Sequence, residues 1–303
     1  MRRHRTTARG TLVPLLLAAG LTAGSIAASL SAQPAHASEQ VVPRIVFPLV
    51  AKTLLWDNYG DPRPNGRHAG IDMENPWRAP VVAAEPGRVE YADSGLGGCM
   101  LYLYGRSGTM YLYIHLNNDA GPRNDNTAGC VEGTAYAVPD RSKVLAGQQI
   151  AFVGDSGDAN GNPHLHFEVH PKGGSDVDPF PYLRKATKVL FGARPGSVFS
   201  LGLRGRVAAA SGIELRVSVS SVRFYPGGRW LAIDPREIAL AVSPSSTVES
   251  RVPRGTREVP LGVADLAKQA YVAVYTAKAK VTRATLVGAP GTLTANRVSS
   301  LVP

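Results

Sequence analysis

The sequence predicts a mainly β protein, with an antiparallel β-sheet domain followed by a second, small β-rich domain. Two segments, 110–116 (MYLYIHL) and 164–170 (HLHFEVH), alternate side chains in the way of a β-strand with one buried face. Similar short segments recur along the chain between stretches of glycine, asparagine, aspartate and proline, which are turn-forming residues. No helical period of useful length interrupts them, and this excludes a helical or α/β architecture.

The first element is a predicted signal peptide at residues 1–37. Four arginines lie among the first nine residues, an apolar segment follows at 11–30, and the sequence AHA at 35–37 fits cleavage after a small residue. We expect a secreted, extracellular protein that has no stable membrane span after cleavage. A signal retained as a membrane anchor is the alternative.

A first folded domain, which contains the candidate metal site described below, is expected at 38–183. Its strands are predicted at 80–83, 87–92, 100–104, 110–116, 150–153 and 164–170. A polar insertion at about 117–143 contains Cys130, and loops of this length are usually functional or tied down. Because export favours oxidation, we expect Cys99 and Cys130 to form a disulfide, with two free thiols as the alternative. The closed loop would contribute roughly 3–4 kcal/mol.

A linker is predicted at 184–199, followed by a basic β-rich C-terminal domain at 200–303 of unknown role. Residues 38–199 hold 15 Lys and Arg against 17 Asp and Glu, whereas 200–303 hold 14 against 6. This charge suits a polyanionic cell surface as a partner, and a scaffold or partner-binding role is the alternative. Nucleic acid is not an expected partner. The strands of this domain are predicted at 213–219, 221–225, 229–233 and 270–275.

The histidines form a pattern that suggests a metal site. Five follow the predicted signal peptide: His68, His115, His164, His166 and His170. His68 lies in GRHAGID, four residues before Asp72, and a straight strand would separate the two by roughly 13 Å. Gly70 makes the required bend easy. A zinc hydrolase needs three protein ligands and a fourth position for water, so a loop with His and Asp plus a distant strand with His meets its requirement.

The segment RHAGID, followed far downstream by HLHFEVH, resembles the lysostaphin/LytM-type zinc metallopeptidases, which are mostly peptidoglycan endopeptidases. WDNYGDPR, GRVEYAD and LAGQQIAFVGDSG support the resemblance, which extends from about Phe47 to Tyr182. The resemblance implies three Zn²⁺ ligands and two catalytic histidines that do not bind the metal: His68, Asp72 and His166 as ligands, and His115 and His164 as catalytic residues.

Physical reasoning supports this division of roles. His164 and His166 share one side of a strand at a separation of about 6–7 Å, which suits one ligand and one neighbouring group. The sequence lacks the glutamate of a His-Glu-x-x-His motif, so His115 and His164 are expected to orient water, transfer its proton and stabilise the oxyanion. Glu168 is either a hydrogen-bond partner of a ligand ring or a solvated side chain. His170 is predicted to be a surface residue.

The sequence therefore predicts a secreted zinc metalloendopeptidase that hydrolyses peptide bonds in bacterial peptidoglycan. Its substrate would be the peptidoglycan peptide, and residues 200–303 would bind anionic wall polymers. Two alternatives stay open. The first is a non-catalytic cell-wall-binding protein or hydrolase activator on the same fold, and the second is a zinc carboxypeptidase that trims stem peptides.

Overall fold

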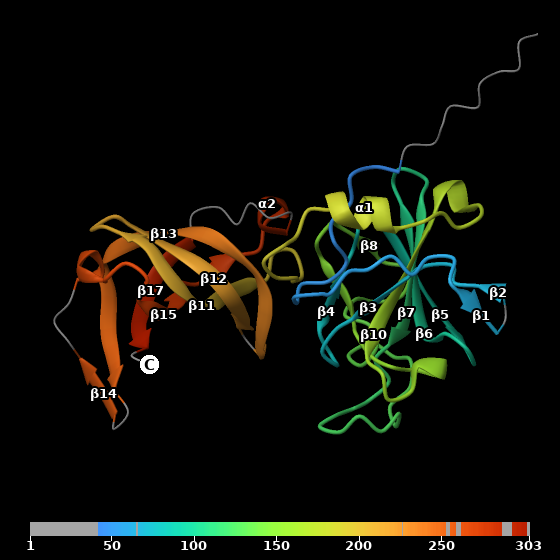
Figure 1. Ribbon diagram of the computed structural model, residues 1–303, viewed down its shortest axis with the longest axis horizontal. Helices are drawn as coiled ribbons and strands as arrows, with labels where there is room; N and C mark the ends of the chain where they lie inside the picture. Colours follow the sequence, from blue (N-terminus) through green and yellow to red (C-terminus); the bar gives the residue numbers. More distant parts are fainter. Residues whose placement is uncertain are drawn as a thin grey trace, which may run out of the picture. The chain divides into compact units, whose positions relative to one another are not determined.

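The computed structural model describes most of the chain after the predicted signal peptide: residues 42–301, except 65, 226, 253–254, 259–261 and 287–292. This part is mostly β with antiparallel sheets, which confirms the predicted fold class (Figure 1). The predicted signal peptide at 1–37 lies outside the described residues. Among the helices that are described, none is long and apolar enough to cross a membrane.

An antiparallel sheet holds the predicted site. In the described chain its strands are β3 (Ile71–Glu74), β5 (Gly87–Ser94), β6 (Gly98–Gly105), β7 (Met110–Leu116), β8 (Lys143–Val144) and β10 (His164–His170). They lie in the order β3-β10-β7-β6-β5-β8. Strand β10 therefore lies between β3 and β7, although about 90 residues separate β3 from it along the chain. This order puts His166 directly opposite Asp72 on β3.

Smaller elements surround this sheet. They are the hairpin of β1 (Pro62–Arg63) and β2 (Gly66–Arg67), the pair of β4 (Pro80–Val82) and β9 (Gln149–Phe152), the short helices η1 (Gly157–Ala159) and η2 (Pro171–Gly173), and α1 (Phe180–Lys185). All six strands predicted in this part are present within a few residues of their expected bounds. The sequence did not predict β1, β2, β3 or β8, which are short and lack the run of apolar residues that marks the equally short β4 and β9.

The core packs against the apolar face of β10. Leu165, Phe167 and Val169 are fully buried, and the ring of Phe167 contacts those of Tyr111 and Tyr113 from β7. Burial of such a side chain contributes about 1.5–3 kcal/mol. The polar face of the same strand is also largely covered, since His164, His166 and Glu168 are at most 9% exposed. These groups therefore lie in a hollow and not on an open surface.

The polar insertion is held in place by a disulfide and by buried side chains. Cys99 on β6 is bonded to Cys130, which confirms the predicted pair. Asp119 is fully buried and accepts hydrogen bonds from the backbone N–H groups of Asp125 and Asn126 at 2.6 and 2.5 Å. The indole N–H of Trp77 donates to the same carboxylate at 2.9 Å. The insertion is thus an ordered loop fixed at several points.

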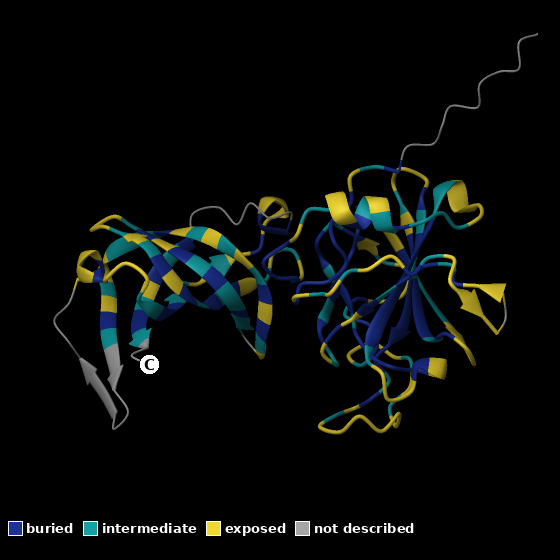
Figure 2. Ribbon diagram, in the orientation of Figure 1, coloured by how far each residue is buried: buried dark blue, intermediate teal, exposed yellow. Residues whose placement is uncertain are grey.

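A second group of strands forms a closed barrel in the described part of residues 198–301. Its strands are β11 (Val198–Ala210), β12 (Glu214–Tyr225), β13 (Trp230–Val252), β15 (Tyr271–Thr276) and β17 (Leu293–Leu301). They pair in the order β12-β11-β15-β17-β13, and β13 returns to pair with β12. Of these pairings, β13 with β17 is parallel and the others are antiparallel. Figure 2 shows buried and more exposed residues alternating along these strands.

The barrel is where the strand predictions were least complete. The predicted segments 213–219 and 221–225 form the single strand β12, and 229–233 is the start of the long β13. Strands β11 and β17 were missed because glycine, serine, asparagine and alanine interrupt their apolar pattern. The shorter elements β14 (Gly255–Glu258), β16 (Ala279–Lys280), η3 (Val263–Asp265) and α2 (Arg283–Leu286) complete the described chain. The division into domains at 38–183, 184–199 and 200–303 stays a prediction.

We expect the disulfide to stabilise the first group of strands. Replacing both cysteines, Cys99→Ala with Cys130→Ala, should lower the free energy of unfolding by about 3 kcal/mol, because the unfolded chain regains the freedom of the loop that the bond closes. Denaturant unfolding of the mature protein measures the change. Reductant should destabilise the wild type to a similar extent and leave the double variant unaffected. An unchanged unfolding midpoint in the double variant would contradict this account.

Candidate metal centre

Three side-chain atoms from separate segments converge at one point. They are Nε2 of His68, Oδ1 of Asp72 and Nδ1 of His166. Asp72 Oδ1 lies 3.0 Å from His68 Nε2 and 2.8 Å from His166 Nδ1, and the two nitrogens are 2.9 Å apart. His68 follows β2, whereas Asp72 and His166 face each other on β3 and β10. The structure therefore brings together the three residues that the sequence predicted as ligands.

Hydrogen bonds on the far side of each ring fix which nitrogen faces this point. His68 donates its Nδ1–H to the backbone carbonyl of Asn58 at 2.7 Å. His166 donates its Nε2–H to Glu168 Oε1 at 2.9 Å. A ring that carries only this one proton presents an unprotonated nitrogen to the Asp72 carboxylate, as a metal ligand does. Three electron-rich atoms this close repel one another unless a cation or a proton lies among them, and two imidazoles with a carboxylate are ligands that Zn²⁺ accepts.

The pKa shifts of Asp72 and His166 agree with a cation site. Burial alone would raise the pKa of Asp72, but hydrogen bonds from His166 and His68 hold it well below its usual range. Burial alone would lower the pKa of His166, but its hydrogen bonds with Asp72 and Glu168 raise it to about 9. His166 thus retains a proton at neutral pH, in the position that a metal ion would take. Metal binding would release that proton.

The second oxygen of Asp72 is held by groups that the sequence analysis did not single out. Arg63 on β1 places a guanidinium nitrogen 2.7 Å from Asp72 Oδ2, and the Asn58 amide donates to the same oxygen at 3.4 Å. Both residues lie in the segment WDNYGDPR, which was noted as a whole and without individual roles. They orient the carboxylate so that its other oxygen faces the two histidines.

His164 and His115 lie beside the three converging atoms. His164 donates its Nδ1–H to the carbonyl of Asn162 at 2.8 Å, and His115 donates its Nδ1–H to the carbonyl of Ser156 at 2.9 Å. Both rings therefore keep Nε2 as an acceptor. His164 Nε2 is 3.6 Å from Asp72 Oδ1, and the centroids of the two rings are 4.8 Å apart. This arrangement resembles the catalytic, non-ligand placement that the sequence predicted.

The backbone of His115 departs from a regular strand. Its φ angle of 61° lies in the left-handed region, which is strained for a residue with a side chain. Backbone hydrogen bonds of 3.1 Å to Gly97 and from Gly154 hold it there. Burial, followed by the nearby charge of His164, lowers the pKa of His115 to about 4, so the ring is neutral at neutral pH. A neutral imidazole can accept a proton.

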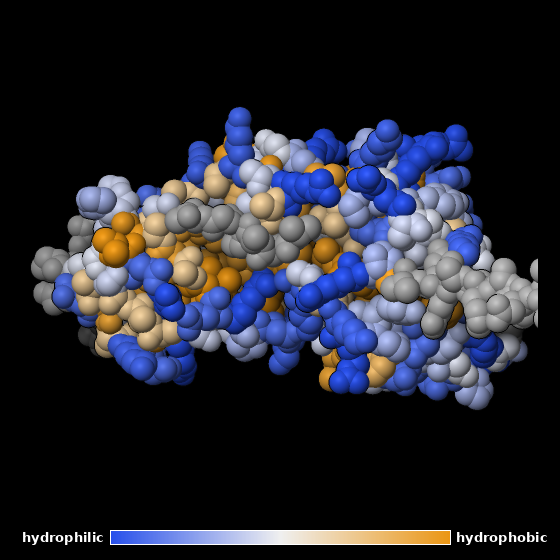
Figure 3. All heavy atoms as spheres, turned by 90° about the horizontal axis from the view of Figure 1, so that it is seen from above, coloured by the Kyte–Doolittle hydropathy of each residue, from blue (hydrophilic) through white to orange (hydrophobic). Residues whose placement is uncertain are grey.

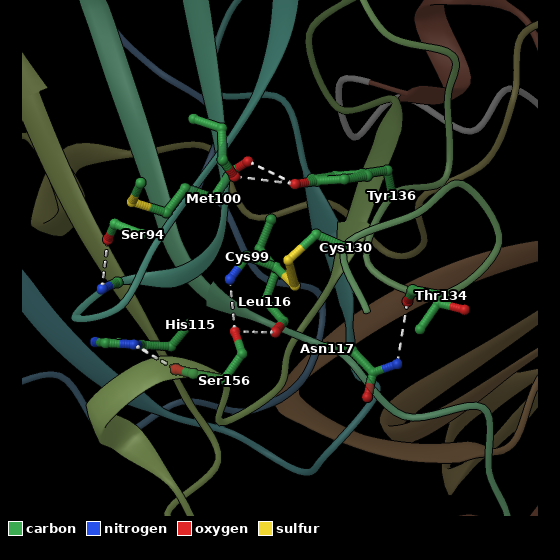
Figure 4. The surroundings of a disulfide bond; sticks show 12 residues. Ser94, Cys99, Met100, His115, Leu116, Asn117, Cys130, Thr134, Tyr136 and Ser156 are labelled. Carbon is green, nitrogen blue, oxygen red and sulfur yellow. Dashed lines mark hydrogen bonds between the residues drawn. A yellow bond between two sulfur atoms is a disulfide. The ribbon is translucent and has the colours of Figure 1, made fainter. Parts of the chain in front are cut away.

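The disulfide lies close to this histidine, as Figure 4 shows. Ser156 donates its hydroxyl to the carbonyl of Leu116 at 2.6 Å and accepts the N–H of Cys99 at 2.8 Å. The carbonyl of the same serine holds the His115 ring. One serine therefore connects the bonded cysteine, the end of β7 and His115. The sequence offered no sign of this role.

An open groove of about 760 Å³ runs past these groups. Besides the histidines and Asp72, its lining includes Arg63, Arg67, Leu96, Met100, Ile114 and Asn160. The β1–β2 hairpin contributes the two arginines, β6 and β7 contribute the apolar side chains of Met100 and Ile114, and Asn160 follows η1. A groove whose lining combines polar, apolar and basic side chains can bind an extended peptide.

Glu168 and His170 form a buried pair behind His166. Glu168 Oε2 lies 2.6 Å from His170 Nε2, and His170 Nδ1 lies 2.9 Å from the Gly174 carbonyl. Burial would raise the pKa of Glu168, but hydrogen bonds with His166 and His170 lower it to about 2. Of the two interpretations offered for Glu168, the hydrogen-bond partner is correct. His170, predicted to be a surface residue, is partly exposed, at 14% of its side chain, and it supports Glu168.

Several known proteins are similar to part of this chain. Lipoprotein NlpD of Yersinia enterocolitica is 36% identical over 104 residues, which cover 34% of this chain and 89% of that protein. The murein hydrolase activator NlpD of Escherichia coli is 33% identical over 118 residues, or 39% of this chain and 26% of that one. Outer membrane antigenic lipoprotein B of Haemophilus influenzae is 32% identical over 152 residues, which cover 48% of this chain and 33% of that protein. The chain thus spans about a third of the length of several relatives.

Solved structures also match over the same part of the chain. The catalytic domain of lysostaphin from Staphylococcus simulans is 26% identical, with a TM-score of 0.34 over 44% of this chain and 92% of that one. A zinc-containing peptidase from Vibrio cholerae is 25% identical, with a TM-score of 0.34 over 45% of this chain and 39% of that one. No family model matches the sequence. The similarity over nearly all of the Yersinia relative shows that this chain belongs to the lysostaphin/LytM (M23) peptidase family.

Proposed function

We propose that this protein is a zinc endopeptidase that hydrolyses peptide bonds in bacterial peptidoglycan. The observation that carries the proposal is the convergence of His68 Nε2, Asp72 Oδ1 and His166 Nδ1 beside two further histidines in an open groove. Three protein ligands leave one position of a tetrahedral ion for water or substrate, as in catalytic zinc sites. The groove gives an extended peptide access to that position.

Each residue of the proposed site has a distinct task. Zn²⁺ bound by His68, Asp72 and His166 would supply a Lewis acid that activates water and polarises the scissile carbonyl. His115, which is neutral, would accept a proton through Nε2, because its Nδ1–H is committed to a backbone carbonyl. His164 has the same orientation and would stabilise the negative charge that develops on the substrate oxygen.

The rival proposal is a protein that activates another hydrolase without cutting peptidoglycan itself. Escherichia coli NlpD, which is 33% identical over the matched region, is named a murein hydrolase activator. An activator needs a binding surface but no metal ligands and no free histidine nitrogens. Here both candidate ligand rings are oriented by hydrogen bonds to a second group, and both neighbouring rings keep Nε2 as an acceptor. This complete arrangement favours catalysis.

We also propose that the protein acts in the cell envelope. Its disulfide would be rare in a reducing cytosol, and three arginines among its first five residues precede an apolar segment. Several relatives are named lipoproteins, among them an outer membrane protein. A substrate in the wall is consistent with this location.

Glu168 should act as a positioning residue for His166. Glu168→Ala removes the acceptor that keeps the proton on His166 Nε2, so we expect zinc affinity to fall about 10- to 100-fold. Glu168→Gln keeps a carbonyl acceptor and should retain most of the affinity. Competition with a chromophoric chelator measures zinc binding without depending on turnover.

Glu74 provides the matched control for this experiment. It lines the same groove as Glu168 but is exposed and paired opposite His164 on the neighbouring strand. Glu74→Ala should leave zinc affinity unchanged. Wild-type affinity in Glu168→Ala, or equal losses in Glu168→Ala and Glu74→Ala, would refute the positioning role.

The histidines should separate metal binding from catalysis. His166→Ala should lose zinc and all peptidoglycan cleavage, because it removes a ligand. His164→Ala and His115→Ala should each retain stoichiometric zinc and lower kcat by a factor of about 10²–10⁴, which is typical of lost proton transfer or oxyanion stabilisation. Metal analysis and the rate of fragment release from purified peptidoglycan give the two readouts.

Two results would contradict this assignment. Loss of zinc from His164→Ala in proportion to its loss of activity would mean that His164 is a ligand. Stoichiometric zinc in His166→Ala would mean that His166 is not one. Circular dichroism of each variant checks that the fold is retained.

A further inference from the structure

The closed barrel of residues 198–301 has a recognisable connectivity. In chain order its five described strands β11, β12, β13, β15 and β17 can be numbered 1 to 5, and they pair as 1-2-3-5-4-1 with strands 3 and 5 parallel. This is the connectivity of an OB-fold, a barrel that often binds oligosaccharides or oligonucleotides on its outer face. Connectivity alone does not establish function, which depends on the side chains that the barrel presents on its outer face.

The interior of the barrel is filled by apolar side chains. Fully buried members come from each of four strands: Leu201, Leu203, Val217, Val219, Val272, Val274 and Val298. Residues that alternate with these point outward because successive side chains leave opposite faces of a strand. The described interior of the barrel is thus occupied by packed apolar side chains, and its outer face carries the residues that a ligand could reach.

A row of outward residues crosses all five strands at one level. The register pairs Trp230 with Arg223, Arg223 with Gly202, Gly202 with Tyr275, and Tyr275 with Arg297. Tyr225 lies next to this row, with its ring centroid 6.4 Å from that of Tyr275. We call Tyr225, Trp230 and Tyr275 the aromatic platform. Along the row, an arginine follows each aromatic residue, and Gly202 lies between the two aromatic–arginine pairs.

Gly202 lets the aromatic platform form. A Cβ at this position would lie 2.8 Å from the Trp230 ring and 3.4 Å from the Tyr225 ring. The two rings therefore lie over the bare backbone of β11, where any larger residue would displace them. They remain half-buried and keep part of their surface exposed.

Arginines flank the rings of the platform. The Arg204 guanidinium carbon lies 3.9 Å from the Trp230 ring centroid, that of Arg223 lies 4.7 Å from Tyr225, and that of Arg297 lies 4.5 Å from Tyr275. Glu249, 4.0 Å from Arg297, is the carboxylate in contact with these arginines among the described ion pairs. The surroundings are strongly basic, since residues 200–303 hold 14 Lys and Arg against 6 Asp and Glu. Figure 3 shows hydrophilic residues (blue) interspersed with hydrophobic ones (orange) on the one face that it draws.

A groove of about 730 Å³ adjoins the aromatic platform. Its lining combines two rings of the platform with hydrogen-bonding and basic side chains: Ser200, Tyr225, Tyr275, Lys278, Asn296 and Arg297. Ring faces stack on the apolar faces of sugars, hydroxyl and amide groups bond to sugar hydroxyls, and cations pair with acidic substituents. These three properties together match a charged sugar chain.

We propose that this groove and the aromatic platform bind an anionic glycan, a chain of sugar rings that carries phosphate or carboxylate groups. The proposal goes beyond the proposed peptidase activity and rests on the same cell-wall setting. The shared chemistry is found in acidic polymers attached to the wall and in the carboxylates of peptidoglycan itself. Single-stranded nucleic acid offers similar groups, but a wall location favours the glycan.

The test measures binding of the zinc-free full-length mature protein, so that cleavage cannot affect the result. Purified sacculi with their attached anionic polymers, and the same sacculi after acid removal of those polymers, are the two glycan probes. We expect saturable, salt-sensitive binding to at least one of them, and the comparison identifies the source of the charge. A 15-nucleotide oligo(dT) is the contrasting probe.

Two variants address the groove directly. Tyr275→Ala and Arg297→Glu should each weaken binding about tenfold or more, because each loses a stacking surface or a charge-assisted contact. Arg206→Glu, an equal charge change at an exposed residue of β11 outside the groove, and Tyr271→Ala, at the other end of β15, should bind like the wild type. Thermal melts check that all four proteins fold. If Tyr275→Ala does not fold, Arg297→Glu alone decides the result.

Several outcomes would overturn the proposal. They are absence of binding to both kinds of sacculi, wild-type binding by Arg297→Glu, an equal loss in Arg206→Glu, and tighter binding of oligo(dT) than of either glycan probe. None of these results bears on peptidase activity. Conversely, a protein that binds sacculi but never cleaves them would refute the proposed function and leave this inference intact.

Discussion

The pairing of β10 with β3 is the constraint on which the candidate site depends. It sets His166 opposite Asp72, two residues that are 94 positions apart in sequence. A slip of one residue would turn the histidines and Glu168 toward the core and turn Leu165 and Phe167 toward the groove. The fully buried apolar face of β10 therefore fixes the register, and the same register assembles the donor atoms. The strand pairing that folds this part of the sheet therefore also brings Asp72 and His166 together.

Backbone carbonyls do much of the orienting at this site. Asn58, Ser156 and Asn162 each accept the Nδ1–H of one histidine, so three rings present Nε2 to the groove. His166 is the exception. Its Nε2 is bonded to Glu168, and it presents Nδ1 to Asp72 instead. Carbonyls are rigid acceptors, and the loops that carry them are tied to the sheet, in part by Ser156 and the disulfide. The insertion thus supports the groove beside which it lies.

The sequence predicts those features that depend on residues close together along the chain, and it misses most of those that depend on tertiary contacts. Alternation is local, so β7 and β10 were predictable, and so were two ligands within RHAGID. The role of Ser156 depends on contacts with residues 40 or more positions away, which no local pattern reveals. Arg63 and His170 contact Asp72 and Glu168, which are nine and two positions away, but an alternating pattern does not show how these side chains are oriented. The left-handed backbone of His115 likewise results from tertiary hydrogen bonds to Gly97 and Gly154. In the barrel, β11 and β17 have weak alternation, and they form strands because each is hydrogen-bonded to a neighbouring strand on both sides.

The most direct test of the central claim is whether the protein alone cuts peptidoglycan. Purified peptidoglycan is incubated with the mature protein after zinc loading, and in parallel after chelation, with no other hydrolase present. Mass analysis then identifies released peptides and their new amino termini, which also separates cleavage inside a peptide from trimming at its end. We expect internal cleavage by the zinc-loaded protein, loss of cleavage on chelation, and recovery when zinc is restored. Intact peptidoglycan under all three conditions, together with stimulation of a separately added wall hydrolase, would contradict the account and identify an activator.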